Sequence, residues 1–264
     1  MNNNQILETA LKQSALEANC RPDDFLLQEN KIVFSTSNPK ARIYLTLPLY
    51  CNLISYGNNI VASVNREIAE TVKEYIDRYH VEHCFETPNM YVLNDELKKK
   101  GKRVSNIAEY FVPDTTMLKE LGCTCKISVL SPQDFANHYK PEWSNALEEK
   151  RKDHDVLAVG AYDGNRLIGL AGCSADCETM WQIGIDVLPS YRRQGIASAL
   201  TSRLALEIID QGKVPFYCTA WSNLGSVRNA IKSGFRPVWV EMTAKPSEEV
   251  DKANSRYTSQ SSTT

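Results

Sequence analysis

One junction restricts the fold of this chain more than any other feature: an alternating run over residues 180–187 leads into the octapeptide YRRQGIAS and then into a helical pattern that follows Ser198. A helix that begins directly after a strand and a turn presents unpaired backbone N–H groups and partial positive charge at its first turn. Gly195 permits a close approach of backbone to ligand, Arg192 and Arg193 add positive charge, and the octapeptide contains no carboxylate. Such a junction predicts a diphosphate site built mainly from backbone amides.

The spacing around this junction argues against two better-known phosphate loops. The sequence has no Gly-x-x-x-x-Gly-Lys-Ser/Thr loop, and it has no Gly-x-Gly-x-x-Gly turn followed by an acidic residue about 20 positions later. We therefore expect neither an ATPase nor a nicotinamide-dependent enzyme.

The composition is that of an ordinary soluble protein. The 264 residues are 42% hydrophobic and 23% charged, with a net charge of −2, and this length favours two domains. The charge gives no reason to expect nucleic acid or an anionic membrane as a partner. The N-terminus lacks a secretory signal pattern, and no apolar stretch approaches the ~20 residues of a membrane span. We expect a cytoplasmic protein.

The cysteines are expected to be reduced thiols. There are 8 of them, scattered through a chain too large to depend on disulfides. Cys123 and Cys125 lack the Cys-x-x-Cys spacing of a zinc ribbon, and Cys84, beside His83, has no second cluster of ligands. The sequence therefore predicts no metal site.

The N-terminal half has the pattern of a mixed α/β domain, residues 1–122. Apolar periodicity and β-branched or aromatic runs predict helices at 3–19, 66–79 and 94–103 and strands at 31–34, 42–47 and 59–64. We place the domain boundary after Gly122, where the pattern changes.

The C-terminal half, residues 123–245, has the pattern of an antiparallel meander followed by helices and further strands. Strands are predicted at 126–130, 155–162, 167–172, 180–187, 214–221 and 238–242, and helices begin at Ser131, Ile196 and Asn223. Asp163-Gly164 is a hairpin signal between two of these strands. The polar residues 246–264 are expected to form a disordered tail.

Two spaced motifs give residues 124–243 a resemblance to a known family. Residues 187–197, which read V-x-P-x-Y-R-x-x-G-I-A, are similar to the Arg/Gln-x-x-Gly-x-Gly/Ala signature of the GNAT superfamily of acyl-CoA-dependent N-acyltransferases. Asn223, followed by Gly234-Phe235, resembles that family's second landmark. The resemblance implies an α+β fold, with a mainly antiparallel sheet flanked by helices, and acetyl-CoA as the co-substrate.

The resemblance also implies roles for residues at the junction. The pantetheine arm would pair with the strand edge from Ile185 to Val187, and the Val187 amide would face the thioester oxygen and stabilise the oxyanion. Asn223 either contacts the arm or caps its helix, and Gly184 marks either a close backbone approach or plain packing. The backbone amides of residues 193–198 would hold the CoA diphosphate, and the arginines would be available for a peripheral phosphate. The residues of this turn expected to bind CoA are Arg192, Arg193, Gln194, Gly195, Ile196, Ala197 and Ser198.

The sequence departs from the family at both catalytic side chains. Ala230 stands where many relatives have a tyrosine that protonates the thiolate, and Cys218 stands where some have a general-base glutamate. The missing acid is tolerable because a thiol of pKa ~8.5 leaves as a thiolate near neutral pH, whereas an amine of pKa ~10.4 needs a base. We predict Asp186 as that base, with Glu178 and Glu241 as alternatives.

The sequence thus predicts an N-acetyltransferase that moves an acetyl group from acetyl-CoA to a primary amine, on a small molecule or a peptide, by direct attack. The absent catalytic side chains keep a second hypothesis open, a catalytically inactive CoA-binding regulatory or scaffold protein. A homodimer is also left open.

The first domain loosely echoes the order of elements in the second, which suggests a degenerate copy of the same fold. The segment Ser63–Glu67 would replace the glycine loop, but it has no glycine and places a carboxylate near the helix start, where it opposes a diphosphate. We expect this domain to bind no CoA and to shape the acceptor pocket or an interface.

Overall fold

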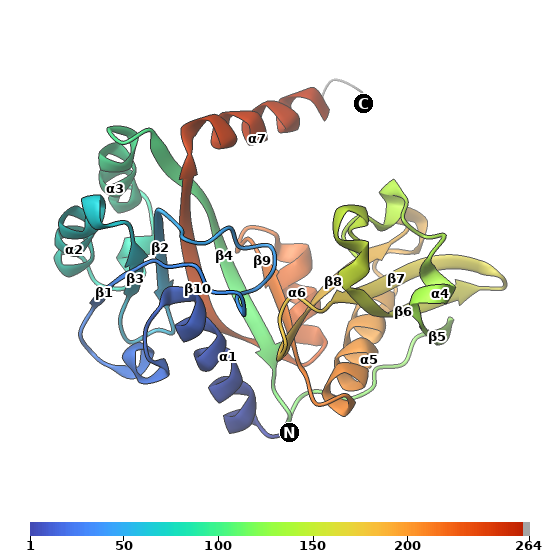
Figure 1. The fold of residues 1–264 in the computed structure, drawn as a ribbon. Helices are drawn as coiled ribbons and strands as arrows, with labels where there is room; N and C mark the ends of the chain where they lie inside the picture. Colours follow the sequence, from blue (N-terminus) through green and yellow to red (C-terminus); the bar gives the residue numbers. More distant parts are fainter. Residues whose placement is uncertain (261–264) are drawn as a thin grey trace. The chain divides into compact units, whose positions relative to one another are not determined.

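The computed structural model describes residues 1–260, and residues 1–255 with their side chains. The chain forms two compact units: unit 1 comprises residues 1–10, 42–44 and 110–238, and unit 2 comprises residues 11–41, 45–109 and the described residues from 239 onward. Two strands, β4 (Lys102–Pro113) and β10 (Phe235–Pro246), contribute residues to both units (Figure 1). The units therefore interleave along the chain, whereas the sequence suggested one boundary after Gly122. That boundary falls in the loop after β4, where the change of pattern is a change of element.

Unit 1 contains five whole strands, in the order β9-β8-β7-β6-β5, besides its parts of β4 and β10. The strands from β5 to β8 form an antiparallel meander, and β8 pairs with β9 in parallel. This mainly antiparallel arrangement confirms the predicted fold class, and Gly164, at φ +57°, turns the predicted hairpin between β6 and β7. The strands are β5 (Lys126–Leu130), β6 (Asp155–Asp163), β7 (Arg166–Ser174), β8 (Met180–Val187) and β9 (Val214–Thr219).

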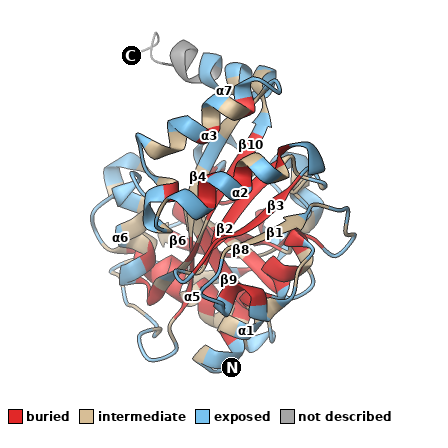
Figure 2. Cartoon of the chain, turned by 90° about the vertical axis from the view of Figure 1, so that its left-hand side faces the viewer, coloured by how far each residue is buried: buried red, intermediate tan, exposed pale blue. Residues whose placement is uncertain are grey.

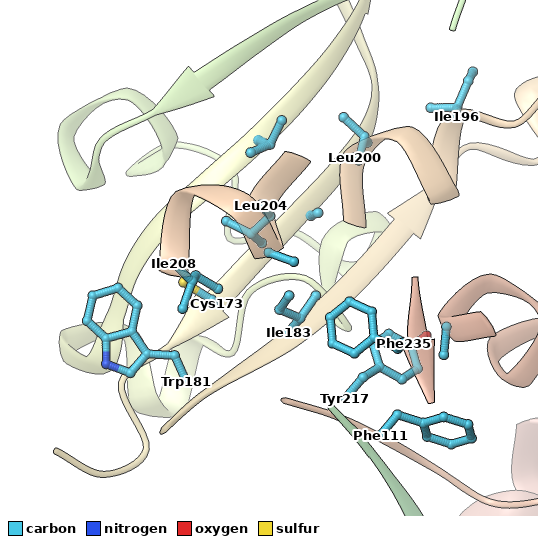
Figure 3. Close-up of a cluster of buried hydrophobic side chains, with 14 of the residues drawn as sticks. Phe111, Cys173, Trp181, Ile183, Ile196, Leu200, Leu204, Ile208, Tyr217 and Phe235 are labelled. Carbon is cyan, nitrogen blue, oxygen red and sulfur yellow. The ribbon is translucent and has the colours of Figure 1, made fainter. Parts of the chain in front are cut away.

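Helix α5 (Ile196–Asp210) packs against β6, β7 and β8 on one face of these strands. The apolar side chains that recur every four residues in the sequence, Ile196, Leu200, Leu204 and Ile208, are each 1% exposed or less. Figure 3 shows them along the helix, in one cluster with side chains of the strands. Burial of this stripe fixes the helix, and hence its N-terminus, against the sheet.

The opposite face of the strands is covered by α4 (Pro132–Phe135) and by residues 143–148, here called loop 143–148. Successive strand residues point to opposite faces. Accordingly Ala171 lies in the core beneath α5, whereas Leu170 packs with Trp143 and Ala146. The other short elements of unit 1 are η4 (Pro141–Trp143), η5 (Glu149–His154), η6 (Pro189–Tyr191) and α6 (Leu224–Lys232).

Unit 2 has its own core, around strands in the order β1-β3-β2-β10-β4. β1 pairs with β3 in parallel, and β2 is antiparallel to β3 and β10. Figure 2 shows burial concentrated in β2 and β3, with exposed residues on the outer faces of the helices α2 and α3. The elements are α1 (Asn3–Ala18), which begins in unit 1, η1 (Pro22–Leu26), β1 (Lys31–Phe34), β2 (Cys51–Ser55), β3 (Val61–Val64), η2 (Arg66–Ile68), α2 (Ala69–Arg78), η3 (Glu82–Phe85) and α3 (Asn89–Lys98).

The strand predicted at residues 42–47 was wrong, because that segment forms no strand in the structure. The Arg42 side chain is 3% exposed, its guanidinium lies 5.1 Å from the Tyr110 ring centre, and its Nη1 donates to the Tyr44 hydroxyl at 2.7 Å. These side-chain contacts override the β-propensity of the segment.

The tail expected to be disordered contains a helix, α7 (Ser247–Gln260). Its first turn is acidic, which suits the positive end of the helix dipole. Arg103 of β4 donates to the Ser247 carbonyl at 2.9 Å and forms an ion pair with Asp251. Because these partners are distant in sequence, composition did not reveal them. Residues 261–264 of the predicted tail lie outside the described residues.

The structure does not confirm that unit 2 is a degenerate copy of unit 1. After β3, Asn65 caps a helical turn, and its Oδ1 accepts from the Glu67 amide at 3.0 Å. In this segment, which would correspond to the glycine loop of unit 1, a side-chain oxygen therefore already satisfies one of the first backbone amides of the helical turn. The common origin of the two units stays a prediction.

Candidate active site

The junction between β8 and α5 has the strand, turn and helix that the sequence predicted. β8 ends at Val187, η6 turns the chain, and α5 begins at Ile196. The Ala199 amide donates to the Gly195 carbonyl at 3.1 Å, which starts the helical hydrogen bonding. The amides of residues 196–198 precede that bond and are the orphan donors of the first turn.

Two residues of the junction have left-handed backbone. Arg193 has φ +62°, and Gly195, the N-cap of α5, has φ +82°. A Cβ atom on Gly195 would meet only Nζ of Lys232, at 3.8 Å, so conformation rather than crowding favours glycine here. A left-handed turn before a helix is a backbone form that binds anions.

Three of the predicted side chains hold the junction itself in shape. Arg192 Nε donates to the Val187 carbonyl at 3.0 Å, and Gln194 Nε2 donates to a carbonyl of η6 at 3.4 Å. The Ser198 hydroxyl donates to the Gly195 carbonyl at 3.0 Å. These bonds stabilise the loop, so the backbone amides are the groups best placed to receive a diphosphate.

Positive charge at the junction comes from three side chains, one of which the sequence did not reveal. Arg192 and Arg193 are exposed, and Lys232, at the end of α6, places its Nζ 3.8 Å from the Cβ position of Gly195. Lys232 reaches the junction because α6 packs beside α5. That packing could not be predicted from a local sequence pattern. Ile196 is buried and Ala197 is partly buried, so these two contribute amides rather than side chains.

The edge of β8 that faces away from β7 carries the amides predicted to pair with the pantetheine arm. The Leu188 amide donates to the carbonyl of Ile168, on β7, at 3.0 Å. Bonded and non-bonded positions alternate along an antiparallel pair. The amides of Ile185 and Val187 therefore face the opposite edge.

β8 and β9 pair over only part of their length. Their parallel register runs from Met180 opposite Val214 to Gln182 opposite Phe216, while β8 continues to Val187. Within the described chain the outward amides of β8 thus lie beyond the end of this ladder. An exposed edge of this kind can accept an extended ligand as an added strand.

Asp186, the base predicted from the sequence, is hydrogen-bonded to loop 143–148. Its Oδ2 accepts from the amides of Asn145, at 2.8 Å, and Ala146, at 3.0 Å, and its Oδ1 accepts from Asn145 Nδ2 at 2.6 Å. A Cβ atom on Gly184 would lie 1.8 Å from the Asn145 carbonyl oxygen. Gly184 therefore marks a close backbone approach, one of the two alternatives left open. The catalytic role of Asp186 stays a prediction.

The other predicted positions have clear surroundings. Asn223 accepts from the Ser226 amide at 3.2 Å and so caps α6, while its contact with the CoA arm stays a prediction. Ala230 is 0% exposed in the core, and Cys218 accepts from Gln182 Nε2 at 3.1 Å. Position 230 therefore supplies no acid where many relatives have a tyrosine, and position 218 supplies no carboxylate base where some have a glutamate.

The alternative bases belong to different units. Glu178, in unit 1, is exposed. Glu241, in unit 2, is 2% exposed and accepts from the Trp239 indole N–H at 2.8 Å. The position of Glu241 in a buried hydrogen bond suits a structural role.

Comparison of the sequence with protein families decides what the junction belongs to. Residues 120–235 match the model of the Acetyltransferase (GNAT) family. Residues 120–235 form a GNAT acetyltransferase domain. This GNAT domain contains the whole meander, the β8–α5 junction and α6, and it confirms the resemblance seen in the sequence.

Several solved structures show partial similarity to the chain. A GCN5-related N-acetyltransferase-like protein from Streptococcus suis is 19% identical, with a TM-score of 0.42, over 60% of this chain and 68% of that one. An acetyltransferase from the GNAT family of Colwellia psychrerythraea is 16% identical, with a TM-score of 0.41, over 55% and 57%. An aminoglycoside N-acetyltransferase in complex with CoA is 19% identical, with a TM-score of 0.35, over 45% and 92%. The chain spans 57% to 69% of the first five structures matched, and no curated protein matches it.

The described residues show neither a cluster of metal ligands nor a membrane-spanning helix. Their His, Cys, Asp and Glu side chains include no group of three or more that could hold a metal ion. None of the helices they form is both long enough and apolar enough to cross a membrane.

Proposed function

We propose that the GNAT domain transfers an acetyl group from acetyl-CoA to a primary amine by direct attack of the amine on the thioester. The observation that carries this proposal is the junction of β8 and α5, where the orphan amides of residues 196–198 adjoin the outward amides of β8. The first set suits a diphosphate, and the second suits an extended arm that carries amide groups. CoA combines these two features in one molecule.

The diphosphate would lie on the amides of residues 193–198. The first turn of α5 carries partial positive charge, and the left-handed Gly195 leaves space in front of it. Arg193 and Lys232 would add charge attraction from the rim, which salt screens because both side chains are exposed.

The pantetheine arm would run along β8 between Val187 and Ile185. The Val187 amide faces the open edge, so it is the proposed donor to the thioester oxygen as negative charge develops there. Arg192 already donates to the Val187 carbonyl. A carbonyl has two lone pairs, so the arm and Arg192 can share this acceptor.

The chemistry asks the protein mainly for positioning and for a base. An alkyl ammonium must lose a proton before it attacks, whereas the CoA thiolate can leave without a protein acid. This accounts for Ala230 in place of a tyrosine. Asp186 is the base proposed from the sequence, although its two oxygens already accept three hydrogen bonds.

We also propose a cytoplasmic location. All the cysteines are free thiols, and Cys51, Cys84 and Cys173 are buried. Free thiols are usual in a reducing compartment.

A second function, a CoA-binding regulatory or scaffold protein without catalysis, is favoured by Ala230 and Cys218. The deciding experiment measures thiol release from acetyl-CoA by the full chain, with polyamines, amino sugars, alkyl amines and peptide N-termini, alongside calorimetric binding of CoA. We expect amine-dependent thiol release. Binding of CoA without turnover of any amine would favour the second function, and no binding of CoA would contradict both.

A further inference from the structure

A small polar cavity lies beside β8, on the face that loop 143–148 covers. Its volume is about 70 Å³, several times what one water molecule needs. Its lining includes Glu148, Arg151, Asp155, Ser174, Gln182 and Gly184. The proposed function leaves this cavity unused.

Three strands contribute one row of residues to the cavity. Asp155 on β6 is opposite Ser174 on β7, and Ser174 is opposite Gln182 on β8. Gly184 lies two positions further along β8, so it belongs to the same face of the strand. The cavity therefore adjoins β8 just before Ile185, where the outward amides begin.

The direction of the proposed CoA arm leads toward this cavity, and in this respect the inference rests on the proposed function. The diphosphate end would be held at the first turn of α5, which follows Val187. An arm whose thioester oxygen lies at the Val187 amide would direct its acetyl group back along β8, toward Ile185 and Gly184. The Ile185 amide faces the same edge as the Val187 amide and lies between the proposed thioester position and the cavity.

Asp155 is the buried carboxylate of the cavity wall, 6% exposed. Its Oδ2 accepts from the Tyr139 hydroxyl at 3.1 Å and from the Glu148 amide at 3.2 Å, and neither bond uses Oδ1. Arg151, which also faces the cavity, pairs with Asp176 at 2.9 Å. Burial raises the pKa of Asp155 to about 6, although the bonds from Tyr139 and Glu148 and the charge of Arg151 act to lower it.

Asp186 offers a useful contrast. Three N–H groups of loop 143–148 already donate to its two oxygens, so both oxygens take part in holding that loop. Asp155 keeps one oxygen outside its hydrogen bonds and lines a space large enough for part of a ligand.

We propose that the cavity holds the reacting end of an unbranched primary amine and that Asp155 takes up its proton. The carboxylates of Glu148 and Asp155 attract the incoming ammonium group. One proton passes from nitrogen to Asp155, and the free amine attacks the thioester carbonyl carbon, so that the C–N bond forms and the C–S bond breaks. A second proton passes from the new amide nitrogen to the departing thiolate, and Asp155 returns its proton to solvent. The products are an acetamide, CoA thiol and one proton.

The size of the cavity limits the acceptor. A volume of about 70 Å³ admits only a few non-hydrogen atoms. A straight CH₂–NH₂ end, as in a lysine side chain or a polyamine, fits such a space. A primary amine on a tertiary carbon, such as tert-butylamine, or an aryl amine does not fit.

The test uses steady-state thiol release by the full-length protein, with butylamine and tert-butylamine as acceptors. We expect turnover of butylamine only. Asp155→Asn should lower kcat/KM by about 10²- to 10⁴-fold, the usual worth of a general base, with CoA affinity within about twofold of wild type. Asp153→Asn, an exposed neighbour of the same chemistry, is the matched control and should keep full activity.

Tyr139→Phe supplies a readout that a purely structural role would not move. It removes a hydrogen bond to the Asp155 carboxylate, so the acidic limb of kcat/KM should shift to higher pH. If Asp155→Asn does not fold, this profile decides the matter alone.

The outcomes separate the two proposals. Full activity of a folded Asp155→Asn variant, or an unchanged profile for Tyr139→Phe, overturns the role of Asp155 and leaves the acetyltransferase proposal standing. Turnover of tert-butylamine as fast as butylamine overturns the acceptor class. Absence of thiol release from wild type with every amine overturns the proposed function and this inference with it.

Discussion

Asp186 accepts two hydrogen bonds from Asn145, one from its backbone amide at 2.8 Å and one from its Nδ2 at 2.6 Å. This pairing ties loop 143–148 to β8, the strand that carries the proposed acyl site. The same loop supplies one wall of the polar cavity. A carboxylate that the sequence suggested as a base therefore has a structural task beside the acceptor space, and experiment can separate the two roles.

Replacement of Asp186 by asparagine should lower the free energy of unfolding by about 1–2 kcal/mol. The carboxylate acceptor is lost, and the NH₂ group of the new asparagine side chain would face the N–H donors of Asn145 and Ala146. Urea denaturation measures the change, with Asp153→Asn as the control for a lost exposed carboxylate. A variant with wild-type stability but no turnover at saturating amine would show instead that Asp186 is the base.

Gly184→Ala should destabilise the protein by about 3 kcal/mol, because the new Cβ would overlap backbone that cannot easily move. The nearest atom, the Asn145 carbonyl oxygen, lies 1.8 Å from the Cβ position. Gly122→Ala is the matched control, since nothing lies within 4 Å of its Cβ position. Equal thermal midpoints for the two variants would contradict the close approach of loop 143–148 to β8.

Asp155 should make the protein less stable as pH rises from about 4 to about 6. Burial raises its pKa to about 6 in the folded state, above the ~3.9 of an unfolded aspartate. In that interval the folded state keeps a proton that the unfolded state has lost, so the free energy of unfolding falls with rising pH, by roughly 2–3 kcal/mol in total. The contribution is complete below the unfolded pKa and is lost above the folded pKa.

Asp155→Asn cannot titrate, so the difference in unfolding free energy between wild type and this variant should change across the same interval. Tyr139, Glu148, Arg151 and Asp176, which act on Asp155, are present in both proteins. Urea denaturation at several pH values from 4 to 7 measures the difference. A difference that is constant with pH would show that Asp155 titrates normally.

Lys232→Gln should weaken CoA binding by about threefold, the scale of an exposed charge contact, and should reduce its dependence on salt. Lys126→Gln, an exposed lysine of β5, should leave both properties unchanged. Calorimetric titration at two ionic strengths measures them. If CoA affinity depended on salt equally in the two variants, Lys232 would not contribute to CoA binding.

The parts of the fold that the sequence predicted are those encoded by neighbouring residues. The meander, the Asp163-Gly164 hairpin and the four-residue apolar spacing of α5 are local patterns, and the structure confirms each. β2 was missed because all five of its residues are buried, so its sequence shows no alternation. The segment around Arg42 was misassigned because its contacts lie with distant aromatic rings.

The candidate site likewise has residues that the sequence predicted and residues that it did not. The junction from Arg192 to Ser198 is contiguous in sequence and carries a family signature, so it could be predicted. Lys232 and Asp155 reach the site through the packing of α6 and through the register of β6 and β7, and neither carries a local signal. A base supplied across a sheet by a strand far from the signature motif is not visible in a single sequence.

The most direct test of the account is the affinity for CoA of two glycine variants at opposite ends of α5, Gly195→Asp and Gly212→Asp. Both glycines are left-handed, at φ +82° and +73°, with no atom closer than 3.8 Å to either Cβ position, so the two substitutions strain the backbone alike. Only Gly195→Asp places a carboxylate where the diphosphate would lie. Calorimetry should show at least about a hundredfold loss of CoA affinity for Gly195→Asp, or roughly 2.8 kcal/mol, and less than about threefold for Gly212→Asp. A folded Gly195→Asp variant that binds CoA as tightly as wild type would contradict the account.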